Sequence, residues 1–75
     1  KENDMKKIDP TYEGMYAIET LAKSTFVKLS ESATKVWMVV GWCKCNKAYE
    51  LTDAEDMNNC KYVKKGKKVF AGFEY

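Results

Sequence analysis

The stretch KVWMVVGWCKC, residues 35–45, is the most apolar run in the chain and holds both of its tryptophans. Successive side chains of an extended chain point to opposite faces of a sheet. One face would then carry Val36, Met38, Val40 and Trp42, and the other Trp37, Val39, Gly41 and Cys43. Because both faces are apolar, the pattern predicts a central β-strand covered on both sides, with the two tryptophans on opposite faces.

The residues after this stretch predict further strands joined by short turns. Asn46 favours a tight hairpin turn because asparagine tolerates a positive φ, and the acidic residues after Thr52 suit the start of a helix. The predicted elements are, in order, a turn at 46–47, a strand at 48–52, a helical turn at 54–57, and strands at 60–63 and 69–75 joined by a turn around Gly66.

The segment 11–29 fits two different structures. Alternation of side chains favours strands at 15–21 and 25–29, whereas Asp9-Pro10 would begin a helix over 11–23. A glycine near the first turn and several β-branched residues disfavour that helix. The two strands are therefore the preferred prediction, and the helix is the alternative.

The sequence predicts a mainly β fold: a small antiparallel sheet or SH3-like barrel of about five strands with one short helical turn. The alternative is an α+β fold, with the 11–23 helix packed on an antiparallel sheet of roughly three to four strands. In both cases we expect the 75 residues to form one domain. The charged residues 1–9 are predicted to be a flexible N-terminal segment.

The composition favours a soluble, folded chain. Apolar residues make up 45% of it, with one proline and four glycines, which is too hydrophobic for disorder. No window approaches the ~20 apolar residues of a membrane span, and the polar start KENDMKKIDP lacks the apolar core of a secretory signal. We therefore expect a cytoplasmic protein without a membrane partner; secretion would be expected only if Cys43 or Cys45 paired with Cys60.

Three residue types are missing from the chain: histidine, arginine and glutamine. All 13 basic residues are lysines, a bias that suggests AT-rich coding, as in a low-GC bacterium or its phages. Without histidine the chain lacks the imidazole of the usual catalytic triads and of common metal sites. We expect no enzymatic activity, no small-molecule substrate and no cofactor.

The cysteines Cys43, Cys45 and Cys60 allow three interpretations. They could be reduced and partly buried, since cysteine packs like a small hydrophobe. A disulfide from Cys60 to one of the other two would leave a single free thiol. A zinc site would need a fourth ligand from an acidic residue, an uncommon ligand set.

The densest positive charge surrounds Gly66 and consists of Lys61, Lys64, Lys65, Lys67 and Lys68. Such a cluster is either a patch for an anionic partner or a solvated hairpin tip that keeps a sheet edge monomeric. Lysine alone supplies nonspecific phosphate attraction, and the arginine that most often reads guanine is absent. Sequence-specific DNA binding is therefore not expected.

A negative segment precedes these lysines and contains Glu50, Asp53, Glu55 and Asp56. Its spacing lacks the alternation of a calcium-binding loop. A capped turn with solubilising charges explains it better, although carboxylates opposite lysines would also orient a partner.

The aromatic residues exceed what a small core requires, which points to a surface that grips another protein. We predict a small non-enzymatic binding module for a protein partner, such as an accessory inhibitor encoded by a phage or mobile element. The alternative is a nonspecific nucleic-acid-binding protein that uses the lysine-rich segment 61–68. The predicted binding residues are Trp37, Trp42, Tyr62, Lys61, Lys64, Lys65, Lys67, Lys68 and Phe70.

Overall fold

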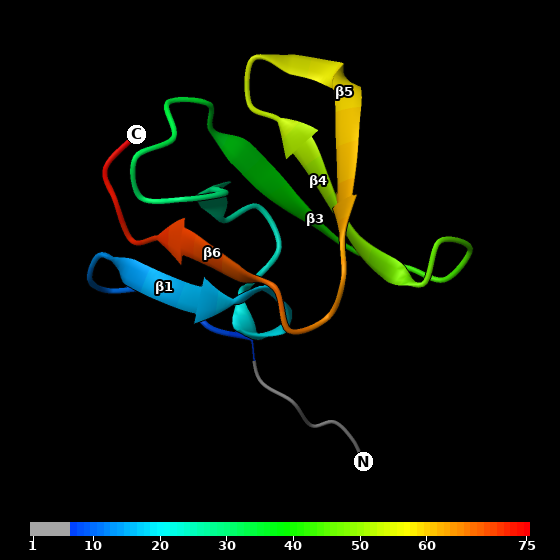
Figure 1. Cartoon of the computed structure of the whole chain (residues 1–75), viewed down its shortest axis with the longest axis horizontal. Helices are drawn as coiled ribbons and strands as arrows, with labels where there is room; N and C mark the ends of the chain where they lie inside the picture. Colours follow the sequence, from blue (N-terminus) through cyan, green and yellow to red (C-terminus); the bar gives the residue numbers. More distant parts are fainter. Residues whose placement is uncertain (1–6) are drawn as a thin grey trace.

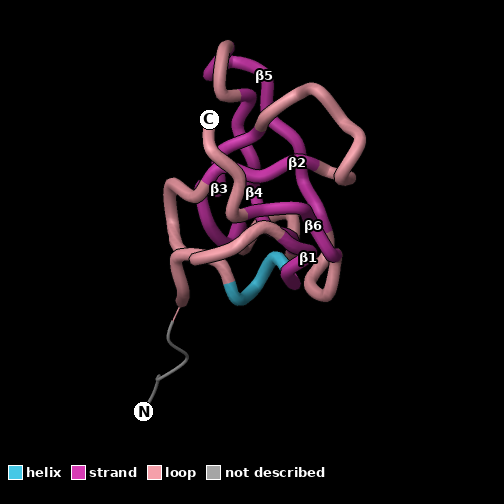
Figure 2. The backbone as a smooth tube through the Cα atoms, turned by 90° about the vertical axis from the view of Figure 1, so that its left-hand side faces the viewer, coloured by secondary structure: helices cyan, strands magenta, loops and turns pink. Residues whose placement is uncertain are grey.

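The computed structural model describes residues 7–75, which form one sheet of six antiparallel strands. The elements are β1 (Gly14–Ala17), the 3₁₀ turn η1 (Ile18–Thr20), β2 (Phe26–Lys28), β3 (Trp37–Cys43), β4 (Ala48–Asp53), β5 (Asp56–Val63) and β6 (Lys68–Ala71). Figure 2 shows η1 in cyan as the only helical segment of the described chain. The mainly β prediction is confirmed, and the alternative helix over 11–23 is wrong.

The strands follow the order β1-β6-β2-β3-β4-β5 across the sheet. β6 inserts between β1 and β2, while β5 lies at the far edge (Figure 1). A hydrogen bond from the Lys67 amide to the Lys64 carbonyl closes the turn between β5 and β6. Such a turn holds its ends within about 7 Å, whereas four strand spacings in a flat sheet span roughly 19 Å. The sheet therefore curls; the SH3-like description of this curl stays a prediction.

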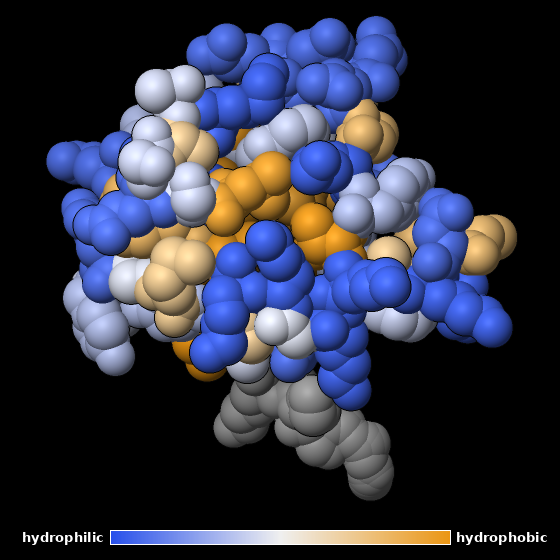
Figure 3. Space-filling view, in the orientation of Figure 1, coloured by the Kyte–Doolittle hydropathy of each residue, from blue (hydrophilic) through white to orange (hydrophobic). Residues whose placement is uncertain are grey.

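The core lies on the inner face of the curled sheet. Its buried residues are Ile18, Leu21, Val27, Trp37, Val39, Leu51, Val63, Val69 and Ala71. Figure 3 shows an apolar area at the centre of one face of the molecule, framed by hydrophilic side chains.

Most of the apolar run at 35–45 forms β3, which lies between β2 and β4 as an interior strand. Its inner face is buried, with Trp37 at 7% and Val39 at 2% exposure. Met38 and Val40 are only half-buried. The predicted central strand is confirmed, but its covering on the second face is partial.

The predicted helical turn at 54–57 is wrong. Residues 54–55 form a tight turn between β4 and β5, and β5 already begins at Asp56. The Asp53 carboxylate accepts a hydrogen bond of 2.9 Å from the Glu55 amide, and this local bond favours a turn over a helix.

Two smaller differences concern turns. In the hairpin between β3 and β4, Lys47 rather than Asn46 has the positive φ, at 52°. Within the predicted strand 15–21, the chain turns at η1, where the Thr20 hydroxyl donates to the Ala17 carbonyl at 2.7 Å.

The N-terminal segment is described only in part. Of the predicted flexible residues 1–9, residues 1–6 lie outside the described chain. Ile8 is held by a parallel bridge to Leu21, with its amide 2.8 Å from the Thr20 carbonyl and its carbonyl 2.9 Å from the Ala22 amide.

Candidate functional site

A β-bulge in β3 decides where Trp42 points. Val39 pairs with Leu51, and Gly41 pairs with Glu50, so Val40 is an extra residue without its own partner on β4. Such an extra residue shifts the alternation of side chains by one position. Trp42 pairs with Tyr49 and therefore lies on the inner face, together with Val39.

The predicted placement of the two tryptophans on opposite faces is thus wrong, because strict alternation makes no allowance for a bulge. Gly41 follows the extra residue with a φ of 142°, a backbone conformation that residues with a Cβ rarely adopt. Glycine at this position permits the bulge and, through it, the inward turn of Trp42.

Trp42 and Tyr49 form an aromatic pair at the open end of the inner face. Their ring centroids are 4.9 Å apart and the planes are inclined by 69°, an edge-to-face contact. The Lys7 ammonium lies 5.2 Å from the centroid of the Tyr49 ring. Trp42 nevertheless remains 48% exposed, so one side of the pair is open to a ligand.

A groove of about 390 Å³ opens beside this pair. It is lined by Lys7, Leu21, Lys23, Val39, Val40, Gly41, Trp42 and Tyr49, and we call it the Trp42 groove. Its floor is apolar, since Leu21 and Val39 are each only 2% exposed. The loop before β2 is fixed against β3 by hydrogen bonds from the Ser24 amide to the Val39 carbonyl (2.7 Å) and from the Val39 amide to the Thr25 carbonyl (2.9 Å).

The strand order places two lysine-bearing turns at the same end of the molecule as the groove. Trp42 pairs with Tyr49, and Tyr49 also pairs with Val63 at the end of β5. The turns that leave these strands, 44–47 and 64–67, therefore emerge at this end. They contribute Lys44, Lys47, Lys64, Lys65 and Lys67.

Glu19 is an acidic residue at this basic end, and its carboxylate is already engaged. It accepts a hydrogen bond of 2.8 Å from the Gly66 amide, which holds the pKa of Glu19 below its ordinary value. The backbone carbonyl of Glu19 accepts a hydrogen bond from the Lys7 ammonium. Glu19 thus ties Lys7 and the 64–67 turn together.

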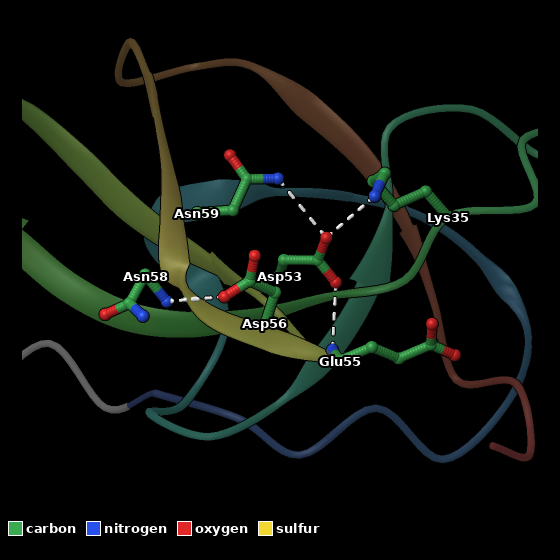
Figure 4. A network of polar contacts seen from close by, with 6 residues as sticks. All are labelled: Lys35, Asp53, Glu55, Asp56, Asn58 and Asn59. Atoms are coloured by element: carbon green, nitrogen blue, oxygen red, sulfur yellow. Dashed lines mark hydrogen bonds and ion pairs between the residues drawn. The ribbon is translucent and has the colours of Figure 1, made fainter.

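The acidic residues of the 53–56 segment form a structural network at the opposite end of β4 (Figure 4). Asp53 is 5% exposed, and its carboxylate pairs with the Lys35 ammonium at 2.7 Å and accepts a bond of 3.2 Å from the Asn59 amide. These bonds, led by that of Lys35, lower the pKa of Asp53 to about 2. The network joins β4, β5 and the segment before β3, and its role is therefore structural.

The predicted binding residues do not come together in one patch. Trp37 and Phe70 are buried, at 7% and 6% exposure, and Phe70 stacks on Phe73 with centroids 5.8 Å apart. Trp42 and Tyr62 are both half-exposed, at 48% and 44%. The predicted lysines, Lys61, Lys64, Lys65, Lys67 and Lys68, are all exposed.

Tyr62 lies on the other face of the sheet from Trp42. Tyr62 pairs with Glu50 and therefore shares its face of the sheet. Adjacent residues of a strand point to opposite faces, so Glu50 lies on the face opposite to that of Tyr49 and Trp42. The nearby Glu50 carboxylate raises the pKa of Tyr62. The half-exposed aromatic residues of the prediction therefore belong to two separate surfaces.

Sequence reasoning missed the residues that complete the groove, above all Tyr49, Leu21, Lys7 and Lys23. One signal was available, because an isolated glycine inside a strand pattern indicates a bulge. A bulge next to Gly41 would have placed Trp42 on the same face of the sheet as Trp37 and Val39.

The three cysteines are free, so neither of the two proposed bridges to Cys60 forms. Cys60 lies opposite Thr52 on β4, and Cys43 lies opposite Ala48. Cys45 is exposed in the hairpin turn. No group of three or more cysteine or acidic residues suited to a metal ion occurs within residues 7–75.

Comparison of the chain with protein families, with curated proteins and with solved structures finds no match. In the part of the chain that the structure describes, no helix has the length and apolar character to cross a membrane. The geometry of the groove and of the charged ends is therefore the basis for a functional proposal.

Proposed function

We propose that this chain is a small non-enzymatic binding module that grips a protein partner through the Trp42 groove. The observation that supports the proposal is the Trp42–Tyr49 pair, in which Trp42 is half-exposed beside an apolar floor. Tryptophan and tyrosine in such pockets are the side chains that most often dominate binding energy at protein interfaces. An accessory inhibitor, of the kind that phages or mobile elements encode, is one form of such a module.

The free edge at β5 favours a side-chain groove over strand addition. Residues 57–59 have no partner on β4, because the pairing passes from Cys60 opposite Thr52 directly to Asp56 opposite Asp53. An irregular edge of this kind resists pairing with another strand.

The remaining parts of both edges are protected by other features. Lys61 pairs with the buried Leu51 and shares its face of the sheet, and an inward-facing charge blunts an edge strand. β1, at the other edge, has only four residues. A partner is therefore expected to dock against side chains rather than to extend the sheet.

Nonspecific nucleic-acid binding is the second candidate, and the lysines of the 64–67 turn beside the groove favour it. Proteins that bind single strands without sequence preference usually stack successive bases on aromatic side chains along one groove. Here Trp42 and Tyr62 lie on opposite faces, so they do not form such a track. The geometry favours a protein partner.

Trp42→Ala and Tyr62→Ala test the proposal as a matched pair, because the two aromatic side chains are similarly exposed, at 48% and 44%, on opposite faces. Tagged wild type and both variants would be used to capture partners from native host lysate, with and without nuclease, followed by mass spectrometry. We expect a nuclease-resistant partner that Trp42→Ala loses and Tyr62→Ala retains. Equal capture by both variants would contradict the role of the groove, and capture that nuclease abolishes would favour nucleic acid.

A further inference from the structure

The lysines on the rim of the Trp42 groove indicate what kind of segment it takes. Resting on the proposed function, we infer that the groove binds an acidic peptide segment: a large apolar side chain on the floor, flanked by carboxylates that pair with Lys7 and Lys23.

The floor requires an apolar anchor. The side chains of Leu21 and Val39 are hydrocarbon, and the paired aromatic residues Trp42 and Tyr49 also line the groove. A volume of about 390 Å³ lies near the lower end of the roughly 300–1,000 Å³ of small-ligand sites. It suits one leucine- or phenylalanine-sized side chain rather than a whole helix.

The rim requires negative charge next to that anchor. The eight lining residues include two lysines and no acidic residue. Lys7 is already positioned by its bond to the Glu19 carbonyl and by its place over the Tyr49 ring. An ammonium group has three donors, so Lys7 retains donors for a carboxylate of the partner.

The surroundings reinforce this preference. The turns 44–47 and 64–67 add five lysines to the groove end, and the Glu19 carboxylate is occupied by the Gly66 amide. The acidic network around Asp53 lies at the far end of β4. Such an arrangement steers an acidic segment to the groove and repels a basic one.

Synthetic peptides test the inference through the fluorescence of Trp42. The probes are a peptide with a central leucine flanked by aspartate and glutamate, the same peptide with serine for leucine, and the leucine peptide with lysine flanks. Oligothymidylate is the fourth probe. Trp42→Phe identifies the part of the emission that comes from the groove, since Trp37 is the only other tryptophan.

We expect only the acidic leucine peptide to change the emission of Trp42, with an affinity that falls as salt rises. Lys23→Glu should weaken this binding about three- to tenfold, because exposed charges contribute modestly and the reversal replaces attraction with repulsion. Lys61→Glu makes the same change of net charge at an inward-facing residue of β5 that does not line the groove, and should have a smaller effect.

Two results would overturn the inference. Equal binding of the lysine-flanked leucine peptide would remove the acidic preference while leaving an apolar groove for a protein partner intact. No response of Trp42 to the acidic leucine peptide would refute the occupant itself. A response to oligothymidylate in that case would favour the nucleic-acid alternative over both proposals.

Discussion

Gly41→Ala tests how the bulge creates the groove. Gly41 has a φ of 142°, and a Cβ added there would meet no atom within 4 Å. Any loss of stability must therefore come from the backbone conformation and not from a steric clash. A residue with a side chain held in such a region costs about 1–3 kcal/mol.

The net effect is smaller than this strain, because alanine also restricts the unfolded chain. That restriction stabilises the folded state by about 0.4–1 kcal/mol, so the midpoints of the two ranges leave an expected loss of about 1.3 kcal/mol in the free energy of unfolding. In a domain of this size each 1 kcal/mol lowers Tm by roughly 4–8 °C. Thermal unfolding followed by circular dichroism measures the shift.

The same substitution should also disturb Trp42. Relief of the strain requires the bulge at Val40 to rearrange, which alters the alternation that holds Trp42 against Tyr49. Acrylamide quenching of tryptophan emission should therefore increase in Gly41→Ala, and binding of the acidic peptide should weaken.

Gly66→Ala is the matched control. Gly66 has a φ of 94°, and its added Cβ also meets open space, but it lies in the turn between β5 and β6. We expect a comparable loss of stability with unchanged quenching of Trp42. Full stability of Gly41→Ala, or equal effects of the two substitutions on Trp42, would refute the reasoning about the bulge.

Three further predictions concern the core, the acidic network and the lysines. Trp37→Ala should lower the free energy of unfolding by about 3–5 kcal/mol, as expected for a large buried aromatic residue; a loss under about 1 kcal/mol in urea denaturation would show that this face is open. Asp53 has its pKa lowered to about 2 from 3.8, so its contribution to stability is fully present above pH 3.8 and is lost as the pH falls towards 2. In Asp53→Asn, acid titration should show a smaller loss of stability across that window than in wild type, and an identical pH dependence would contradict the role of the carboxylate. A variant in which four lysines are replaced together by glutamate should keep its fold by circular dichroism and bind an acidic partner more weakly. The four residues are Lys64, Lys65, Lys67 and Lys68. Unchanged affinity would show that these lysines do not contribute to binding.

The sequence predicted those parts of the fold that depend on local composition. The apolar run at 35–45 identified β3, because a strand with apolar residues on both of its faces is typical of the interior of a sheet. The lysines around Gly66 identified the turn before β6, and Gly66 there has the positive φ that such a turn uses. These features need no knowledge of distant contacts.

The parts that failed depend on single residues and on long-range packing. The acidic residues after Thr52 favoured a helix, but one bond from the Asp53 carboxylate to the Glu55 amide produced a hairpin turn. The bulge at Val40 turned Trp42 to the inner face. Strict alternation of side chains does not predict this orientation, because it assumes that each residue has its own partner on the next strand. Leu21 and Lys23 lie at the groove through long-range contacts, among them the hydrogen bonds between the loop before β2 and Val39.

The indole N–H signals of the two tryptophans test the central claim, that the bulge turns Trp42 into a groove which binds an acidic segment. In a ¹H–¹⁵N spectrum of labelled protein, each tryptophan gives one such signal, assigned with Trp42→Phe. Titration with the acidic leucine peptide should shift the Trp42 signal, together with the backbone signals of Leu21 and Gly41, and leave that of Trp37 unchanged. Shifts confined to Tyr62 and its neighbours on the other face, or none at all, would contradict the account.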